Sequence, residues 1–438
     1  MTSFSFERAV GVLLLVLTVI LSLMMVHSPG TVDVSTFLNW TEVVYQNGVV
    51  DGYSKLIYAS EYPPISYAIL YIARAFGNMV GLSPLMGFKV TILAFQLVSA
   101  GIILLISGSY WVAAAFNASL LLSGVALGYM DVCVAPPLIA AFWAFRARRD
   151  VLGMALFLIA CLIKWQPLIV APFIGIYLFE ISNLRSCRDA VGGRLFWQLV
   201  VLVAVTIALL SLIFGLAPAR SLWHGMSHPF LSGNALNLPW VAEFFYKLLF
   251  PSSYRQLIVE LVEKGRLSAS YGFSNQAELK VLMPPSIYLL PIKIIFWIGF
   301  GTVVIRAMRS EKTFKNCLLF SIIGLMTYVI WNSGVHENHL FVAVVLAYML
   351  MLHERSREHR AIVTILVVMF NVNLFVFYGV TGTELQSPVV GVDLSVILAM
   401  LYAVAWLLLA AYAWEAAQPA KEGVRAEKET HAPVVVSN

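Results

Sequence analysis

Residues of the types that acid–base chemistry requires gather in one polar stretch, residues 33 to 65, of an otherwise apolar chain. The stretch begins with Asp33 and carries three further carboxylates, Glu42, Asp51 and Glu61. A positioned carboxylate can take the proton of an attacking hydroxyl. Helix capping is the alternative for Asp33, because the run that follows it has one apolar helical face. The residues alone leave both interpretations open.

A second group of polar residues stands at the ends of short apolar runs. Lys164 lies between two of them, and a buried ammonium is costly without an anionic partner or a water-filled cavity. We therefore expect Lys164 to bind an anion. Asp131 and the pair His336 and Glu337 have similar positions, with a helix cap and a polar helix junction as the respective alternatives.

The histidines and cysteines give no sign of a metal centre. His224 and His228 are four residues apart but have no acidic third ligand nearby. The cysteines lack both metal-ligand spacing and a pairing pattern; they are Cys133, Cys161, Cys187 and Cys317. We predict neither a metal nor another cofactor.

Composition fixes the class of protein. Hydrophobic residues make up 60% of the 438 residues and charged residues only 12%, whereas about a quarter of a soluble domain is charged. The chain is therefore predicted to be an all-α polytopic membrane protein in a lipid bilayer. Its net charge of +5 is explained by cytoplasmic loops, because the basic residues fall in short clusters between apolar runs. We do not expect a nucleic-acid partner.

Apolar runs of about 20 residues predict about twelve transmembrane helices. They lie at residues 8–27, 88–107, 111–128, 132–146, 151–164, 166–181, 195–214, 286–305, 316–332, 339–353, 361–378 and 392–415. The run from Pro63 to Val80 is not counted, because a span there would place four basic clusters on the side opposite to Arg8, against the positive-inside rule. Its prolines, tyrosines and arginine instead predict an interfacial helix.

This topology divides the chain into a transmembrane module, residues 1–415, and a polar tail, residues 416–438, which we expect to be disordered and cytoplasmic. Both termini are then cytoplasmic, and the two long external loops are residues 28–87 and 215–285. The polar turns at 128–131, 164–167 and 332–339 face the same external side as Asp33.

Five short motifs in this order resemble those of the GT-C superfamily of membrane glycosyltransferases. Within it, the pattern is most similar to the dolichyl-phosphate-glucose-dependent glucosyltransferases and their smaller prokaryotic relatives. The motifs are Asp33 with Trp40, Glu42 and Glu61-Tyr62-Pro63-Pro64; Gly128-Tyr129-Met130-Asp131; Lys164-Trp165-Gln166-Pro167; Asn234-Ala235-Leu236-Asn237 with Trp240; and Val335-His336-Glu337. Two departures are Asn338, where relatives carry a basic residue, and Ser35, where the glucosyltransferases favour a second acid.

The resemblance implies a GT-C-type bundle in a bacterial inner or plasma membrane. It implies inverting transfer of a hexose from a polyprenyl-phosphate donor to a hydroxyl of a glycan, lipid or protein acceptor on the extracytoplasmic side. Asp33 would be the catalytic base. The donor phosphate would be bound by Lys164, His336 and Arg220, and the substrates by Tyr62, Asp131, Gln166, Glu337 and Asn237. The helix after Pro63 and Pro64 would border the access path of the lipid.

Two other functions remain open. A polymerase or ligase of lipid-linked glycans also uses external basic residues, but its donor is a diphosphate-linked glycan. A lipid or sugar transporter is less favoured, because its charges are expected near the bilayer midplane and the chain has no internal repeat.

Overall fold

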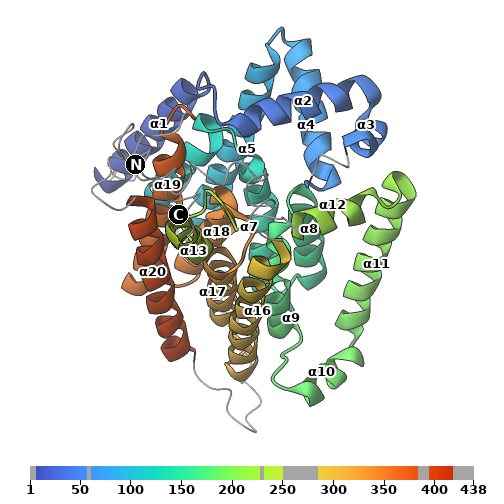
Figure 1. Ribbon diagram of the computed structural model, residues 1–438, viewed down its shortest axis with the longest axis vertical. Helices are drawn as coiled ribbons and strands as arrows, with labels where there is room; N and C mark the ends of the chain where they lie inside the picture. The colour runs from blue at the N-terminus through green and yellow to red at the C-terminus, as the bar shows by residue number, and fades with distance from the viewer. Residues whose placement is uncertain (1–5, 57–60, 227–230, 250–284, 383–393, 418–438) are drawn as a thin grey trace, which may run out of the picture.

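The computed structural model describes residues 6–56, 61–226, 231–249, 285–382 and 394–417, and these are mostly helical (Figure 1). Seven of the described helices are long and apolar enough to cross a membrane. The prediction of a mostly helical membrane protein with several spans is therefore confirmed. The seven helices are α1 (Phe6–Met25), α5 (Pro84–Ser107), α11 (Arg194–Phe214), α16 (Pro285–Arg309), α17 (Phe314–Trp331), α19 (Arg357–Tyr378) and α20 (Leu394–Ala416).

The other five predicted spans hold shorter helices, and four of these are joined to a 3-10 or π turn. They are α6 (Tyr110–Leu120) with the π turn η1 (Leu122–Ala126), η2 (Met130–Val134) with α7 (Ala135–Arg146), α8 (Asp150–Ile163), η3 (Gln166–Val170) with α9 (Ala171–Leu178), and η4 (Glu337–Leu340) with α18 (Phe341–His353). The count of twelve spans therefore stays a prediction. The 3-10 turns η2, η3 and η4 contain predicted site residues.

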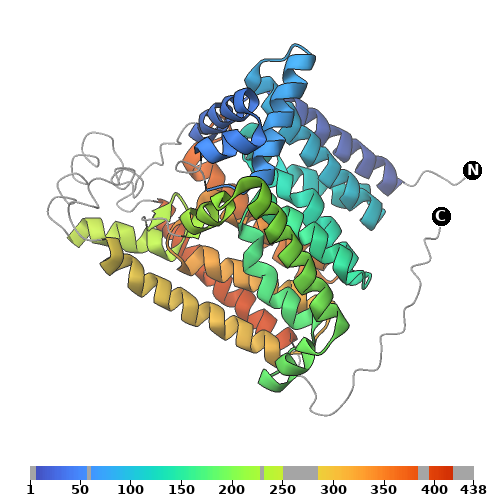
Figure 2. The ribbon, with the colours of Figure 1, turned by 90° about the vertical axis from the view of Figure 1, so that its right-hand side faces the viewer.

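The first predicted external loop is itself helical. It forms α2 (Val32–Asn47), α3 (Val49–Leu56) and α4 (Pro64–Met79), which cover one end of the bundle in both ribbon views (Figures 1 and 2). An ion pair joins α4 to α2, with 3.3 Å between Arg74 Nε and Glu42 Oε2. At 16 residues α4 is not among the helices long enough to span, and the interfacial position expected for residues 63–80 stays a prediction.

The second predicted external loop is described only in part. It contributes α12 (Ala217–Met226) and α13 (Leu238–Leu249), and α10 (Leu184–Val191) lies between α9 and α11. Two short strands, β1 (Ser232–Gly233) and β2 (Val335–His336), pair in parallel and tie this loop to the turn before α18. The rest of the loop, and the tail beyond Ala417, lie outside the described residues.

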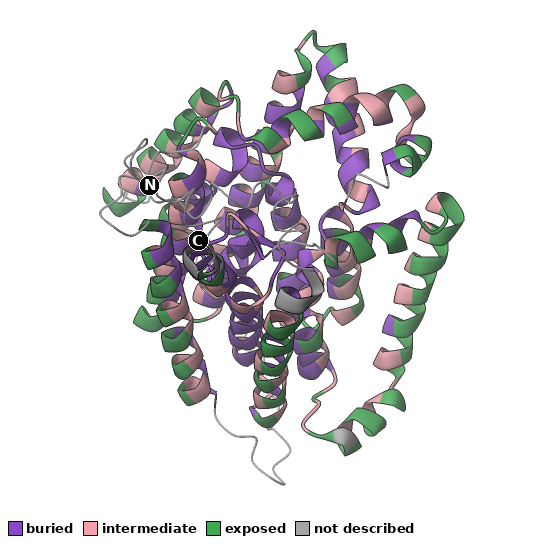
Figure 3. Cartoon of the chain, viewed as in Figure 1, coloured by how far each residue is buried: buried purple, intermediate pink, exposed green. Residues whose placement is uncertain are grey.

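Burial separates central from peripheral helices (Figure 3). Nearly every side chain of α17 and α18 is buried, whereas α11 buries only Leu199. An apolar helix that is exposed on nearly all sides needs an apolar surrounding, which a bilayer supplies. The core therefore lies around α17 and α18, and α11 is at the periphery.

Candidate active site

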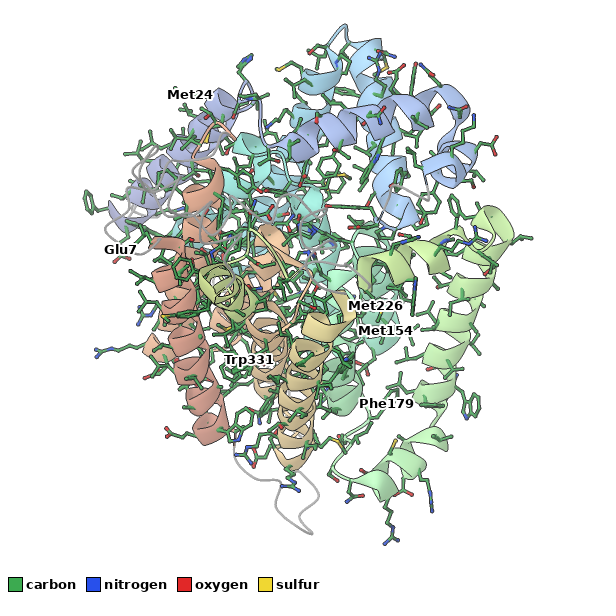
Figure 4. The ribbon with its side chains drawn as sticks, viewed as in Figure 1. Glu7, Met24, Met154, Phe179, Met226 and Trp331 are labelled. Carbon is green, nitrogen blue, oxygen red and sulfur yellow. The ribbon has the colours of Figure 1, made fainter. Side chains whose placement is uncertain are left out.

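A cavity of about 640 Å³ lies where α2, α12, α16 and the turns before α9 and α18 meet. Part of its wall is polar, formed by Asp33, Glu61, Tyr62, Lys164, Gln166, His336, Asn338 and His339. Met226, which Figure 4 labels at the end of α12, belongs to its apolar wall. Five of the nine predicted site residues thus line one cavity: Asp33, Tyr62, Lys164, Gln166 and His336.

Asp33 lies in the first turn of α2, but it is not the cap of that helix. The N-cap residue is Thr31, and the half-buried Asp33 carboxylate accepts no hydrogen bond from any described residue. Burial raises the pKa of Asp33 above its ordinary value of 3.8; Lys164 opposes this shift, while Asp131 and Glu61 add to it. The carboxylate is therefore available to accept a proton inside the cavity.

Lys164 has an anionic partner within the protein. Its Nζ lies 2.7 Å from both Oδ1 and Oδ2 of Asp131, which is buried behind it and does not line the cavity. Asn338 Nδ2 donates to Asp131 Oδ2 at 3.0 Å, and the ammonium lies 5.2 Å from the centre of the Tyr62 ring. The ion pair with Asp131 and the cation–π contact with Tyr62 thus hold the Lys164 ammonium at the cavity wall.

Contacts to the backbone of one turn position both Asp33 and Asp131. Thr31 N donates to Leu127 O at 3.1 Å, which attaches the start of α2 to the turn that carries Asp131. The buried Lys89 ammonium donates to the carbonyls of residues 125 and 126, at 2.8 and 2.9 Å. Gly128 has a φ of +78°, and a Cβ there would lie 2.6 Å from Val34 Cγ2, so a side chain would separate the two segments.

His336 is held by the strand pair. It lies in β2 opposite Gly233, and a Cβ on that glycine would come within 2.6 Å of His336 Nδ1. The imidazole is half-exposed at the cavity, with its Nδ1 3.9 Å from Glu337 Oε2. The close approach of the two strands therefore depends on the absence of a side chain at residue 233.

Two further predicted residues, Glu337 and Asn237, are buried outside the cavity wall. Glu337 is buried and accepts a hydrogen bond from the Tyr129 hydroxyl. Asn237 is buried too; its Oδ1 accepts from Trp240 N at 2.9 Å and its Nδ2 donates to Val329 O at 3.1 Å. Both residues connect elements of the bundle.

Arg220 is exposed on α12 and is not part of the cavity wall, so its position gives no support to the predicted phosphate contact. A different cation, Lys293 of α16, lines the cavity together with the aromatic side chains of Phe296, Trp297 and Phe300. The sequence of residues 286–305 predicts a plain apolar span. The one feature of this run that could have indicated a cavity wall is its single lysine, Lys293.

In the described parts of the chain, no three His, Cys, Asp or Glu residues are grouped so that they could hold a metal ion. No model of a known protein family matches the chain, and no curated protein matches it. The arguments for a function therefore rest on the geometry of the cavity.

Proposed function

We propose that the protein is a membrane glycosyltransferase that moves a hexose from a polyprenyl-phosphate donor to an acceptor hydroxyl on the extracytoplasmic side, with inversion. One observation carries the proposal. A carboxylate that accepts no hydrogen bond from the described residues, Asp33, shares a cavity with the buried ammonium of Lys164 and with an apolar wall. Transfer from a lipid-linked anionic donor needs all three features: a base for the acceptor hydroxyl, a cation for the phosphate and an apolar surface for the lipid.

Asp33 acts as the general base. As the acceptor oxygen attacks the anomeric carbon, the bond from that carbon to the donor phosphate breaks on the opposite face, which inverts the configuration. The hydroxyl proton passes to the Asp33 carboxylate, and the polyprenyl phosphate leaves as an anion. A base with a raised pKa accepts this proton more readily than an ordinary aspartate does.

Lys164 and His336 stabilise the charge of the departing phosphate. Fixed donors and cations aimed at developing negative charge are worth more in a cavity that is largely shielded from water than in solution. The Lys164 ammonium is pre-positioned by Asp131, so it needs no rearrangement when the charge develops. Asp131 therefore acts through Lys164 as a positioning residue.

Tyr62 and Gln166 are suited to bind the sugar. Both line the cavity, and Gln166 Oε1 is a buried acceptor without a hydrogen-bond partner among the described residues. Asn338 Oδ1 in the same wall is also unpaired. Sugar hydroxyls donate readily to amide oxygens, and these two buried oxygens would reach a bound hexose after rotation of their side chains.

The decisive test supplies membranes that contain the protein with labelled polyprenyl-phosphate hexoses. We expect transfer to an endogenous acceptor by the wild type and a loss of about 10²–10⁴-fold in the Asp33→Asn variant, the usual contribution of a general base. The matched control is Asp51→Asn, which removes an exposed carboxylate of α3 and should transfer at the wild-type rate.

Equal transfer by wild type and Asp33→Asn would remove the assignment of the base. Transfer from a diphosphate-linked glycan, with none from any monophosphate donor, would identify a polymerase or ligase instead. Movement of an intact lipid or sugar across the membrane without a new glycosidic bond would identify a transporter.

A further inference from the structure

The cavity wall changes from polar to apolar in the same order along two elements. On one side, Lys164 and Gln166 are followed by Leu168, Ile169 and Pro172 of η3 and α9. On the other side, Lys293 is followed along α16 by aromatic side chains at positions 296, 297 and 300. The two elements meet beyond this point, where the ring centroids of Phe173 and Phe300 are 5.7 Å apart.

Lys293 stands at the boundary between the two parts of the cavity. Residues 296 and 297 follow it by three and four positions, so they share its face of the helix. Lys293 is half-buried, and it forms no hydrogen bond or ion pair with any described residue. Lys293 lies near one end of the apolar span, and its half-buried charge must be compensated by an anionic ligand or by water.

Among the described residues, Lys293 is the cavity lysine without an anionic partner. Lys164 is already neutralised by Asp131 through two contacts of 2.7 Å. Of these two lysines, Lys293 is therefore the one whose charge an entering anion would compensate. The surface beyond it is apolar and partly exposed, since 59% of Trp297 is accessible. A fitting ligand has a single anionic head and a hydrocarbon chain.

We propose that the apolar arm between η3, α9 and α16 holds the first units of a prenyl chain and that Lys293 binds the phosphate attached to it. This inference rests on the proposed function, for which it names the lipid site. It also differs from the access path expected from the sequence, because α4 contributes no side chain to the cavity wall. The lipid reaches the cavity beside α16 instead.

Binding is measured on the full-length protein in detergent, with a labelled sugar-free undecaprenyl phosphate and the corresponding undecaprenol as probes. We expect Lys293→Met to weaken binding of the phosphate by about tenfold or more, because a charge-assisted contact is lost, and to leave binding of the alcohol unchanged. Lys293→Arg should restore most of the phosphate affinity. Lys315→Met, which removes a lysine at the far end of α17, is the charge control.

A second pair of variants tests the apolar arm. Ile169→Trp fills it and should weaken binding of both probes, whereas Ile298→Trp adds the same bulk on an exposed face of α16 outside the cavity wall and should not. Inorganic phosphate alone should not displace the lipid. Displacement by inorganic phosphate at low concentration would identify a free-phosphate site and overturn the lipid assignment.

The inference and the proposed function can fail separately. If the wild type binds undecaprenyl phosphate and transfers sugar, but Lys293→Met binds both probes as the wild type does, the assignment of Lys293 is wrong and the enzyme class stands. If the wild type binds the phosphate no better than the alcohol, the phosphate site is wrong. Absence of transfer from every monophosphate donor, with lipid binding retained, would reject the proposed function alone.

Discussion

Asp33 and Lys164 face the same cavity but differ in how their charges are compensated. Lys164 is held by two contacts to Asp131, whereas Asp33 accepts no hydrogen bond from the described residues. The ion pair with Asp131 keeps the Lys164 ammonium in place. The Asp33 carboxylate has no such contact to a described residue and can accept a proton. The capping interpretation of Asp33 would need contacts to the first turn of α2, and the N-cap position belongs to Thr31.

If Asp33 is the proposed base, its raised pKa should appear in the pH dependence of transfer. The base works only when it is ionised, so the rate should fall on acidification through a pKa that lies above the ordinary value of 3.8. The measurement is initial transfer rate against pH, with reversibility checked by returning each sample to neutral pH. Asp51→Asn should keep the same profile, and an acid limb at or below 3.8 would contradict the assignment.

At the scale of elements, three predicted site residues lie in 3-10 turns at the starts of helices. The turns η2, η3 and η4 begin three of the shorter apolar segments, and they place Asp131, Gln166 and Glu337 at the same end of the bundle. Such turns are common at helix termini. The strand pair β1 and β2 then fixes His336 beside η4.

Gly233 offers a test of this strand pair. Gly233→Ala places a Cβ 2.6 Å from His336 Nδ1, so the ring must shift from its present position. A displacement of about 1 Å can cost about 100-fold in rate, and we expect a loss of 10-fold to about 100-fold in transfer with the fold retained. Gly101→Ala in α5 is the control, because a Cβ there meets nothing within 4 Å. A wild-type rate in Gly233→Ala would show that His336 does not act in transfer.

For the whole molecule, the apolar runs were predictable and the contacts between them were not. Each predicted span holds a helix, because hydrophobicity is a local property of sequence. The pairing of Tyr129 with Glu337 joins residues 208 positions apart, and no local pattern reports such a contact. Asp33, Lys164 and His336 were found as polar residues beside apolar runs. The sequence does not single out Lys293, because the mean hydropathy of its run stays high enough to predict a plain span.

The predicted orientation in the membrane can be tested on the natural cysteines. Cys187 of α10 is exposed, whereas Cys133, Cys161 and Cys317 are buried. Since α10 belongs to a loop predicted to be cytoplasmic, a membrane-impermeant maleimide should label the wild type in inverted vesicles and leave it unlabelled in intact cells. Cys187→Ser should remove the signal.

Asn39, exposed on α2, supplies the opposite reporter. Asn39→Cys in the Cys187→Ser background should be labelled in intact cells, because α2 is predicted to be extracytoplasmic. Labelling of both positions from the same side would contradict the predicted topology.

The separations along the chain also set the order in which the protein is completed during synthesis. Asp131 and Lys164 are 33 residues apart and can neutralise each other as soon as both segments are in the bilayer. The hydrogen bond from Tyr129 to Glu337 and the one from Asn338 to Asp131 can form only later. The ribosome adds residues 337 and 338 more than two hundred residues after Tyr129 and Asp131. A nascent chain that stops before Glu337 carries Asp33 and Lys164 but lacks Asn338 and His339 of the cavity wall. If the proposed function is right, such a chain is expected to be inactive.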